Sequence, residues 1–189
     1  FVGFARRPFT DEEYRQMLTG ALDLSKDDKW HEFIKHIYYQ QGFFDEKTGY
    51  DELIEKLRVF DKKVGSHIPR LFYLATPPDN YEMILKYLHN TKLSTNISSK
   101  LVIEKPFGRD LDTARELDKK LGRMFEENQI YRVDHYLAKE VVQNMIAFRF
   151  ANSIFEPIWK NEYIDHVQIT WFEKEGVRTR GKFFDGVGM

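Results

Sequence analysis

The middle of the chain alternates short apolar runs with amphipathic segments, and this alternation limits the folds available to it. Residues 70–75 form an apolar run that a Thr-Pro-Pro turn closes, and residues 80–88 carry a helical pattern. The same order follows again, with a predicted strand at residues 100–104 and a predicted helix at about residues 111–126. Strands separated by helices pair in parallel through right-handed crossovers. The sequence therefore predicts an α/β fold with a parallel sheet and flanking helices.

The first third of the chain adds a predicted strand at residues 1–5 and three predicted helices. Thr10 and Glu13 have the spacing of a capping box and predict the start of the first helix. A second helix is predicted from Ser25 through the aromatic-rich segment to Tyr39, and a third at about residues 50–63.

The pattern changes after Asn128. Residues 130–134 predict a short strand and residues 139–150 a helix, and residues 164–172 alternate like a long strand. We expect a domain boundary near Asp134, with residues 1–134 in a nucleotide-binding domain and residues 135–189 at the start of a β+α domain. Clefts between domains are favoured ligand sites, so a site is expected at this boundary.

Polar residues follow the predicted strand at residues 100–104. Glu104 and Lys105 end the apolar run, and Pro106 and Gly108 restrict the backbone beside them. Ligands of open α/β sheets bind at the carboxyl ends of strands, so Lys105 lies where a ligand is expected. The alternative is an ordinary surface lysine whose stem lies along the protein.

A second polar segment, residues 132–140, combines cations, a histidine, a phenol and carboxylates. His135, Tyr136 and Lys139 can donate to a phosphate, whereas the carboxylate of Asp134 can only accept. This combination suits a site that binds an anionic substrate and orients a base. The alternative is a solvated face of mixed charge, with Tyr136 in the core and Lys139 paired with Glu140.

Composition excludes several classes of function. The 189 residues are 42% hydrophobic, so they can bury a core, and the net charge of −1 does not predict binding to nucleic acid or membrane. The chain has no cysteine, and its six histidines lack metal-site spacing, so no metal centre is predicted. No apolar run approaches the ~20 residues that span a bilayer, and no signal peptide is visible. A cytoplasmic protein is expected.

The two polar segments together resemble the glucose-6-phosphate dehydrogenase family. Residues 104–109 match its Glu-Lys-Pro-Phe-Gly-Arg motif, and residues 132–140 match its Arg-Ile-Asp-His-Tyr-Leu-Gly-Lys-Glu signature except at Val133 and Ala138. Shorter matches lie at residues 4–6, 71–75, 77–78, 149–152, 158–159 and 184–185. The resemblance covers the whole chain in the family's order. It implies a Rossmann-like sheet.

The resemblance implies oxidation of glucose 6-phosphate to 6-phosphogluconolactone with NADP, the first step of the pentose phosphate pathway. Lys105 would contact both substrate and cofactor. Its peptide bond to Pro106 would be cis and would set the direction of the lysine side chain. The substrate phosphate would meet three residues, His135, Tyr136 and Lys139.

Four further residues take roles by resemblance. Asp134 would partner the catalytic histidine, and Glu173 would bind the sugar hydroxyls. Arg6, or in competition Arg7, would meet the 2′-phosphate of NADP, and Tyr81 would lie near the nicotinamide. His166 is expected at the surface and cannot replace the catalytic histidine.

Two family segments do not occur in the sequence. The glycine-rich phosphate loop that follows the family's first strand is missing, and the segment with the catalytic histidine is expected beyond Met189. We therefore expect an internal fragment of an enzyme that is a homodimer or homotetramer. Another sugar oxidoreductase with a Glu-Lys-Pro motif, of the glucose–fructose oxidoreductase type, is an alternative, as is a fragment that binds sugar phosphate without catalysis.

Overall fold

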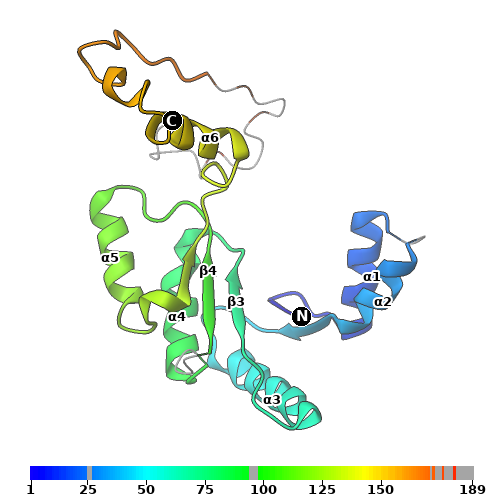
Figure 1. Ribbon diagram of the computed structural model, residues 1–189. Helices are drawn as coiled ribbons and strands as arrows, with labels where there is room; N and C mark the ends of the chain where they lie inside the picture. Colours follow the sequence, from blue (N-terminus) through cyan, green and yellow to red (C-terminus); the bar gives the residue numbers. More distant parts are fainter. Residues whose placement is uncertain (25–26, 94–97, 171, 173–175, 177–180, 182–189) are drawn as a thin grey trace.

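The computed structural model describes residues 1–24, 27–93, 98–170, 172, 176 and 181. Its centre is a parallel sheet of order β3-β4-β5, built from β3 (Leu71–Leu74), β4 (Lys100–Ile103) and β5 (Ile130–Arg132). Helices α4 (Tyr81–Asn90) and α5 (Leu111–Leu121) connect the strands and flank the sheet (Figure 1). The predicted α/β architecture is confirmed.

Burial explains why these elements assemble. Leu101 and Ile103 of β4 are almost fully buried, and so are Leu85 of α4 and Leu121 of α5. Removing such side chains from water contributes roughly 1.5–3 kcal/mol each. Asp110 caps α5 by accepting from the Thr113 amide at 2.8 Å, which fixes where that helix begins.

A second, two-stranded parallel sheet pairs β1 (Val2–Ala5) with β2 (Tyr38–Gln41). Helices α1 (Asp11–Leu22) and α2 (Asp28–Phe33) lie between these strands in sequence, and α3 (Lys47–Val64) follows β2. The Thr10–Glu13 capping box is present at the start of α1, as predicted. Short 3₁₀ helices lie at η1 (Ile34–His36), η2 (Pro78–Asn80), η3 (Glu127–Gln129) and η4 (Glu156–Ile158).

Two predicted elements are wrong. The helix expected through Tyr39 ends at Phe33, and after η1 the chain forms β2 instead. The aromatic side chains of this segment fit a strand because β1 supplies a parallel partner. The strand expected at residues 164–172 is not formed by the described residues there, where Val167 and Ile169 are exposed. Alternation alone cannot hold a strand without a partner for its backbone.

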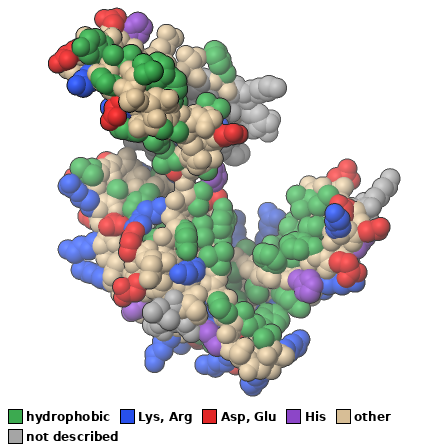
Figure 2. Space-filling model, in the orientation of Figure 1, with side chains coloured by type: hydrophobic (Ala, Val, Ile, Leu, Met, Phe, Trp, Pro, Cys, Tyr) green, Lys and Arg blue, Asp and Glu red, His purple; other side chains and the backbone are tan. Residues whose placement is uncertain are grey.

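Helix α6 (Glu140–Phe150) and the residues described directly after it, up to residue 170, stand apart from the sheet, joined to it by the loop after β5 (Figure 1). No residue of α6 is buried, and hydrophobic side chains cover much of the surface of this part (Figure 2). The loop between β5 and α6 therefore lies where the two parts of the molecule meet.

Candidate active site

Lys105 stands two residues beyond β4, at the carboxyl end of the central strand. Its peptide bond to Pro106 is cis, as the resemblance implied. Gly108 has a φ of 82°, and a Cβ there would lie 2.5 Å from the amide nitrogen of Ala114. A side chain at this position would force the loop away from α5, so the glycine lets the loop pack tightly behind Lys105.

Asp134 meets Lys105 because β4 and β5 are adjacent parallel strands that end at the same edge. The Val133 amide donates to the Ile103 carbonyl at 2.9 Å and continues the pairing beyond β5. Lys105 Nζ lies 2.7 Å from Asp134 Oδ1, with 45% of the lysine side chain exposed. The hydrogen bond from Lys105 is the largest cause holding the pKa of Asp134 below its usual value, and amide donors add to it.

Tyr136 gathers two cations around one ring. Lys105 Nζ lies 4.9 Å from the centre of the ring, and Lys139 Nζ lies 4.4 Å from it. Aromatic faces attract ammonium groups at such distances. The strand-end lysine and the lysine that precedes α6 therefore converge on one place, with His135 in the same loop.

Glu104 adds a carboxylate to this cluster. It belongs to the Glu-Lys-Pro-Phe-Gly-Arg motif, but the sequence predicted no role for it. It accepts a short hydrogen bond from the Tyr73 hydroxyl, and its Oε1 lies 4.0 Å from His135 Nε2. The Tyr81 hydroxyl donates to the Glu104 carbonyl at 3.2 Å. Tyr73 could be found only from strand register, because nothing in its local sequence distinguishes it from a packing residue.

Arg132 fixes the loop that carries Lys105. Its guanidinium reaches Asp118 of α5 and Glu127 of η3, each at 2.6 Å, and lies over the Phe107 ring at 5.1 Å. These carboxylates are the main reason that the pKa of Arg132 is raised. Arg132, the first residue of the segment 132–140, thus contacts Phe107 of the segment 104–109.

The remaining predicted residues lie apart from this cluster or inside the fold. Arg6 follows β1 and is exposed, as is Arg7. Tyr81 is 2% exposed, so it presents little surface to a ligand. Glu173 lies outside the described residues. His166 is exposed and its Nδ1 lies 2.9 Å from Asp165, so it is a surface histidine as predicted.

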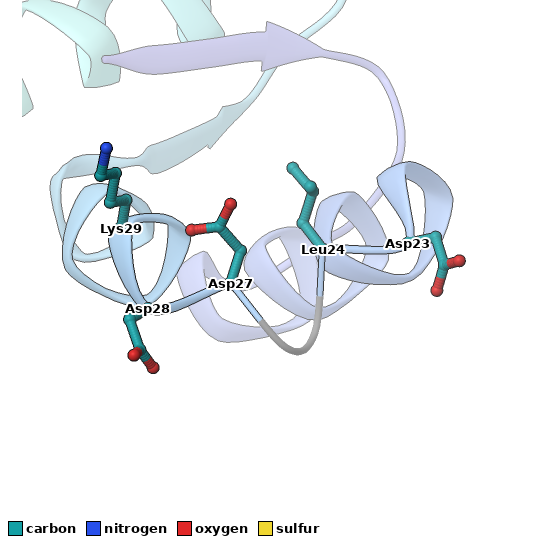
Figure 3. A pocket seen from close by; sticks show the side chains of 5 residues that line it. All are labelled: Asp23, Leu24, Asp27, Asp28 and Lys29. Atoms are coloured by element: carbon teal, nitrogen blue, oxygen red, sulfur yellow. The ribbon is translucent and has the colours of Figure 1, made fainter.

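A shallow depression of about 580 Å³ lies between α1 and α2, on a part of the molecule away from β4 (Figures 1 and 3). Its lining consists of Asp23, Leu24, Asp27, Asp28 and Lys29. In Figure 3 the side chains of Asp23 and Asp28 point away from the others, so they do not converge on a ligand. We therefore assign the site to the Lys105 cluster and not to this depression.

Within the described ranges, no group of three or more histidine, cysteine or acidic residues could hold a metal ion. No helix formed by these residues is long and apolar enough to cross a membrane.

The parallel sheet β3-β4-β5, flanked by helices and followed at its carboxyl edge by the Lys105–Asp134 pair, defines a Rossmann-type α/β protein with a polar cluster at the carboxyl ends of its strands. Comparison with known families makes the assignment specific. The model of "Glucose-6-phosphate dehydrogenase, NAD binding domain" matches residues 1–144, and that of the family's C-terminal domain matches residues 146–189. The chain belongs to the glucose-6-phosphate dehydrogenase family, and its first domain is of the nicotinamide-dinucleotide-binding kind.

Individual relatives agree along the whole chain. Glucose-6-phosphate 1-dehydrogenase of Chlamydia pneumoniae is 42% identical over 100% of this chain and 39% of its own length. The enzyme of Dictyostelium discoideum is 38% identical over 99% of this chain and 38% of its own length. The chain thus spans about two fifths of the length of these curated relatives.

Solved structures give the same result. A glucose-6-phosphate dehydrogenase in complex with its substrate glucose-6-phosphate superposes with a TM-score of 0.79 at 34% identity, over 100% of this chain and 40% of that one. The Mycobacterium avium enzyme gives a TM-score of 0.74 at 31% identity, over 100% and 41%. The family match does not favour the alternative of a glucose–fructose type of oxidoreductase.

Proposed function

We propose that the protein containing this chain oxidises D-glucose 6-phosphate to 6-phospho-D-glucono-1,5-lactone and transfers the hydride to NADP. The observation that carries the proposal is the convergence of Lys105 and Lys139 on the Tyr136 ring, beside Asp134. The chain's similarity to a glucose-6-phosphate dehydrogenase in complex with its substrate supports the choice of sugar phosphate.

The substrate phosphate is assigned to His135, Tyr136 and Lys139. Lys105 is already paired with Asp134, whereas no carboxylate among the described residues forms an ion pair with Lys139. Lys139 also precedes the first turn of α6, where unpaired amide groups and the helix dipole favour a negative charge. An anion bound here would interact with the Lys139 ammonium, with the amide groups at the start of α6 and with the hydrogen-bond donors of His135 and Tyr136.

Lys105 is assigned to hold the sugar against the cofactor. A cation that contacts both partners fixes their relative orientation, which removes part of the entropic barrier to hydride transfer. Its loop is fixed behind it by Gly108 and by the Arg132–Phe107 contact. The nicotinamide, when bound, accepts the hydride that leaves C1 of the sugar.

Asp134 is assigned to orient the histidine that takes the proton from the C1 hydroxyl. Lys105 Nζ and the amides of Tyr136 and Leu137 all reach its Oδ1. No described residue donates to Oδ2, which leaves that oxygen for an imidazole N–H. A lowered pKa keeps Asp134 ionised near neutral pH, the state that stabilises an imidazolium.

The preference for NADP over NAD is assigned to Arg6. Arg6 is exposed and directly follows β1 of the two-stranded sheet, and no described carboxylate pairs with it. A guanidinium can bind a phosphate through two parallel hydrogen bonds. Glu173 at the sugar hydroxyls, Tyr81 near the nicotinamide, a domain boundary near Asp134, a cytoplasmic location and a dimeric or tetrameric assembly belong to the same proposal.

The test is Lys139→Ala in the full-length enzyme, with Lys119→Ala on the exposed face of α5 as the matched control. Loss of a cation from the phosphate site should raise KM for glucose 6-phosphate about tenfold or more. KM for NADP should change less than about twofold, and the control should behave like the wild type. Equal loss of affinity for substrate and cofactor would contradict the assignment.

A further inference from the structure

Residues of β2 and the segment directly after it hold the corner that carries Arg6. The Tyr39 hydroxyl lies 2.7 Å from the Ala5 carbonyl and 2.6 Å from the Arg7 carbonyl. Gln41 Nε2 donates to the Arg6 carbonyl at 3.2 Å, and the Gly42 amide donates to the Ala5 carbonyl at 3.0 Å. The three successive carbonyls of this corner therefore all have donors from residues 39–42.

Tyr39 is itself held firmly. It is 4% exposed, and its ring packs against Tyr14 at 4.7 Å and Phe9 at 5.7 Å. Asp11 accepts from its amide at 2.7 Å, and Lys56 donates to its carbonyl while lying 2.9 Å from Asp11. Both backbone groups and the ring of Tyr39 are thus fixed before any ligand arrives.

The phenol links the carbonyl groups of Ala5 and Arg7, the residues before and after Arg6. A tyrosine hydroxyl has a single proton, so it is shared between the Ala5 and Arg7 carbonyls and ties them to one point. Burial raises the pKa of Tyr39, which keeps this proton in place well above neutral pH. The Arg6 side chain, in contrast, is exposed and leaves from a backbone that is already ordered.

We propose that Tyr39 is a positioning residue for Arg6 and thereby helps set the preference for a dinucleotide with a 2′-phosphate over one with a 2′-hydroxyl. The inference rests on the proposed role of Arg6. A bidentate guanidinium–phosphate contact depends on direction, and a fixed backbone lowers the entropy lost when the contact forms. A dinucleotide without the 2′-phosphate makes no such contact, so it gains nothing from the ordered corner.

The experiment compares Tyr39→Phe with the wild type in the full-length enzyme, with Tyr38→Phe on the same strand as the matched control. The Tyr38 ring packs against Phe60, and its hydroxyl makes no hydrogen bond to the described corner. We expect Tyr39→Phe to lower the ratio of kcat/KM for NADP to kcat/KM for NAD about tenfold. The kcat with NADP and KM for glucose 6-phosphate should stay within about twofold, and Tyr38→Phe should leave the ratio unchanged.

A double variant separates positioning from general stability. If Tyr39 acts through Arg6, Arg6→Ala alone and Arg6→Ala with Tyr39→Phe should give the same cofactor ratio. Equal losses with both cofactors, or additive effects in the double variant, would overturn the proposal. If Arg6→Ala leaves the ratio unchanged, the cofactor role of Arg6 fails and this inference fails with it. A lowered ratio in Arg6→Ala with an unchanged ratio in Tyr39→Phe overturns this inference alone.

Gln41→Leu covers the case in which Tyr39→Phe does not fold. Gln41 is exposed, so its loss should leave stability nearly unchanged while freeing the Arg6 carbonyl. The expected fall in the cofactor ratio is about threefold, and an unchanged ratio in this variant would then count against the proposal.

Discussion

The sheet β3-β4-β5 and helix α6 both carry many apolar side chains, but only the sheet and its flanking helices bury a part of theirs. In the sheet and its helices, Leu101, Ile103 and Leu121 are at most 1% exposed. In α6, Val141 is 73% exposed and Ile146 is 56% exposed, and no residue of the helix is buried. Burial therefore fixes the first region, whereas α6 is held mainly by its own backbone hydrogen bonds.

The candidate site takes one lysine from each region. Lys105 extends from the buried sheet through a loop fixed by Gly108 and Phe107, whereas Lys139 immediately precedes the exposed helix α6. The sheet side of the site is ordered by packing within the described part of the chain. The α6 side depends on the loop that contains Tyr136, so variants in the two regions should respond differently.

The largest contrast is expected in stability. Leu101→Ala should lower the free energy of unfolding by about 3 kcal/mol, because it leaves a cavity in a closed core. Ile146→Ala in α6 should change it by less than about 0.5 kcal/mol, because little burial is lost. Equilibrium denaturation of the chain measures both values. Similar losses for the two variants would show that α6 is packed as tightly as the sheet.

A second contrast is expected in kcat, between a variant of the site carboxylate Asp134 and a variant of the surface carboxylate Asp165. Asp134→Asn in the full-length enzyme should lower kcat about 100-fold with little change in KM for glucose 6-phosphate, because the base loses its ionised partner. Asp165→Asn, on the exposed segment after α6, should leave kcat unchanged. Steady-state kinetics checks both, and an unaltered kcat in Asp134→Asn would refute the orienting role.

A smaller effect on stability is expected at the Arg132–Phe107 contact, which joins the segments 104–109 and 132–140. Arg132→Lys should lower the free energy of unfolding by about 1 kcal/mol, because an ammonium cannot reach both carboxylates and also stack on Phe107. Arg115→Lys on the exposed surface of α5 is the control, with no measurable change expected. Thermal unfolding of the two variants compares them. If the two variants were equally stable, the Arg132 contacts would contribute nothing measurable to the free energy of unfolding.

The smallest effect concerns pH. The pKa of Asp134 is lowered in the folded state, chiefly by the hydrogen bond from Lys105, so its contribution to stability is present above its ordinary value of 3.8. That contribution is lost as the pH falls through the folded pKa. The stability gap between wild type and Asp134→Asn should therefore begin to narrow at about pH 5 and continue to narrow as the pH falls through the folded pKa, which lies below 3.8. A gap that stays constant over this range would contradict the ion pair.

Local sequence determined most of the elements of the sheet and its helices. The predicted strands at residues 70–75, 100–104 and 130–134 and the capping box at Thr10 are present, because apolar periodicity and capping act within a few residues. Strand β2 was missed because its partner β1 lies 36 residues away in the sequence. The described residues of the alternating segment 164–172 form no strand, because strand pairing requires a second segment as partner.

The sequence by itself also determined the edge of the sheet at which the site lies. Lys105 follows one predicted strand and Asp134 ends another, and adjacent parallel strands bring their carboxyl ends together. Only the tertiary structure decided the contacts of Glu104 with Tyr73, of Arg132 with Phe107, and of Tyr39 with the backbone around Arg6. Each of these joins residues more than 20 positions apart, and their meeting depends on strand register and packing, which local patterns do not encode.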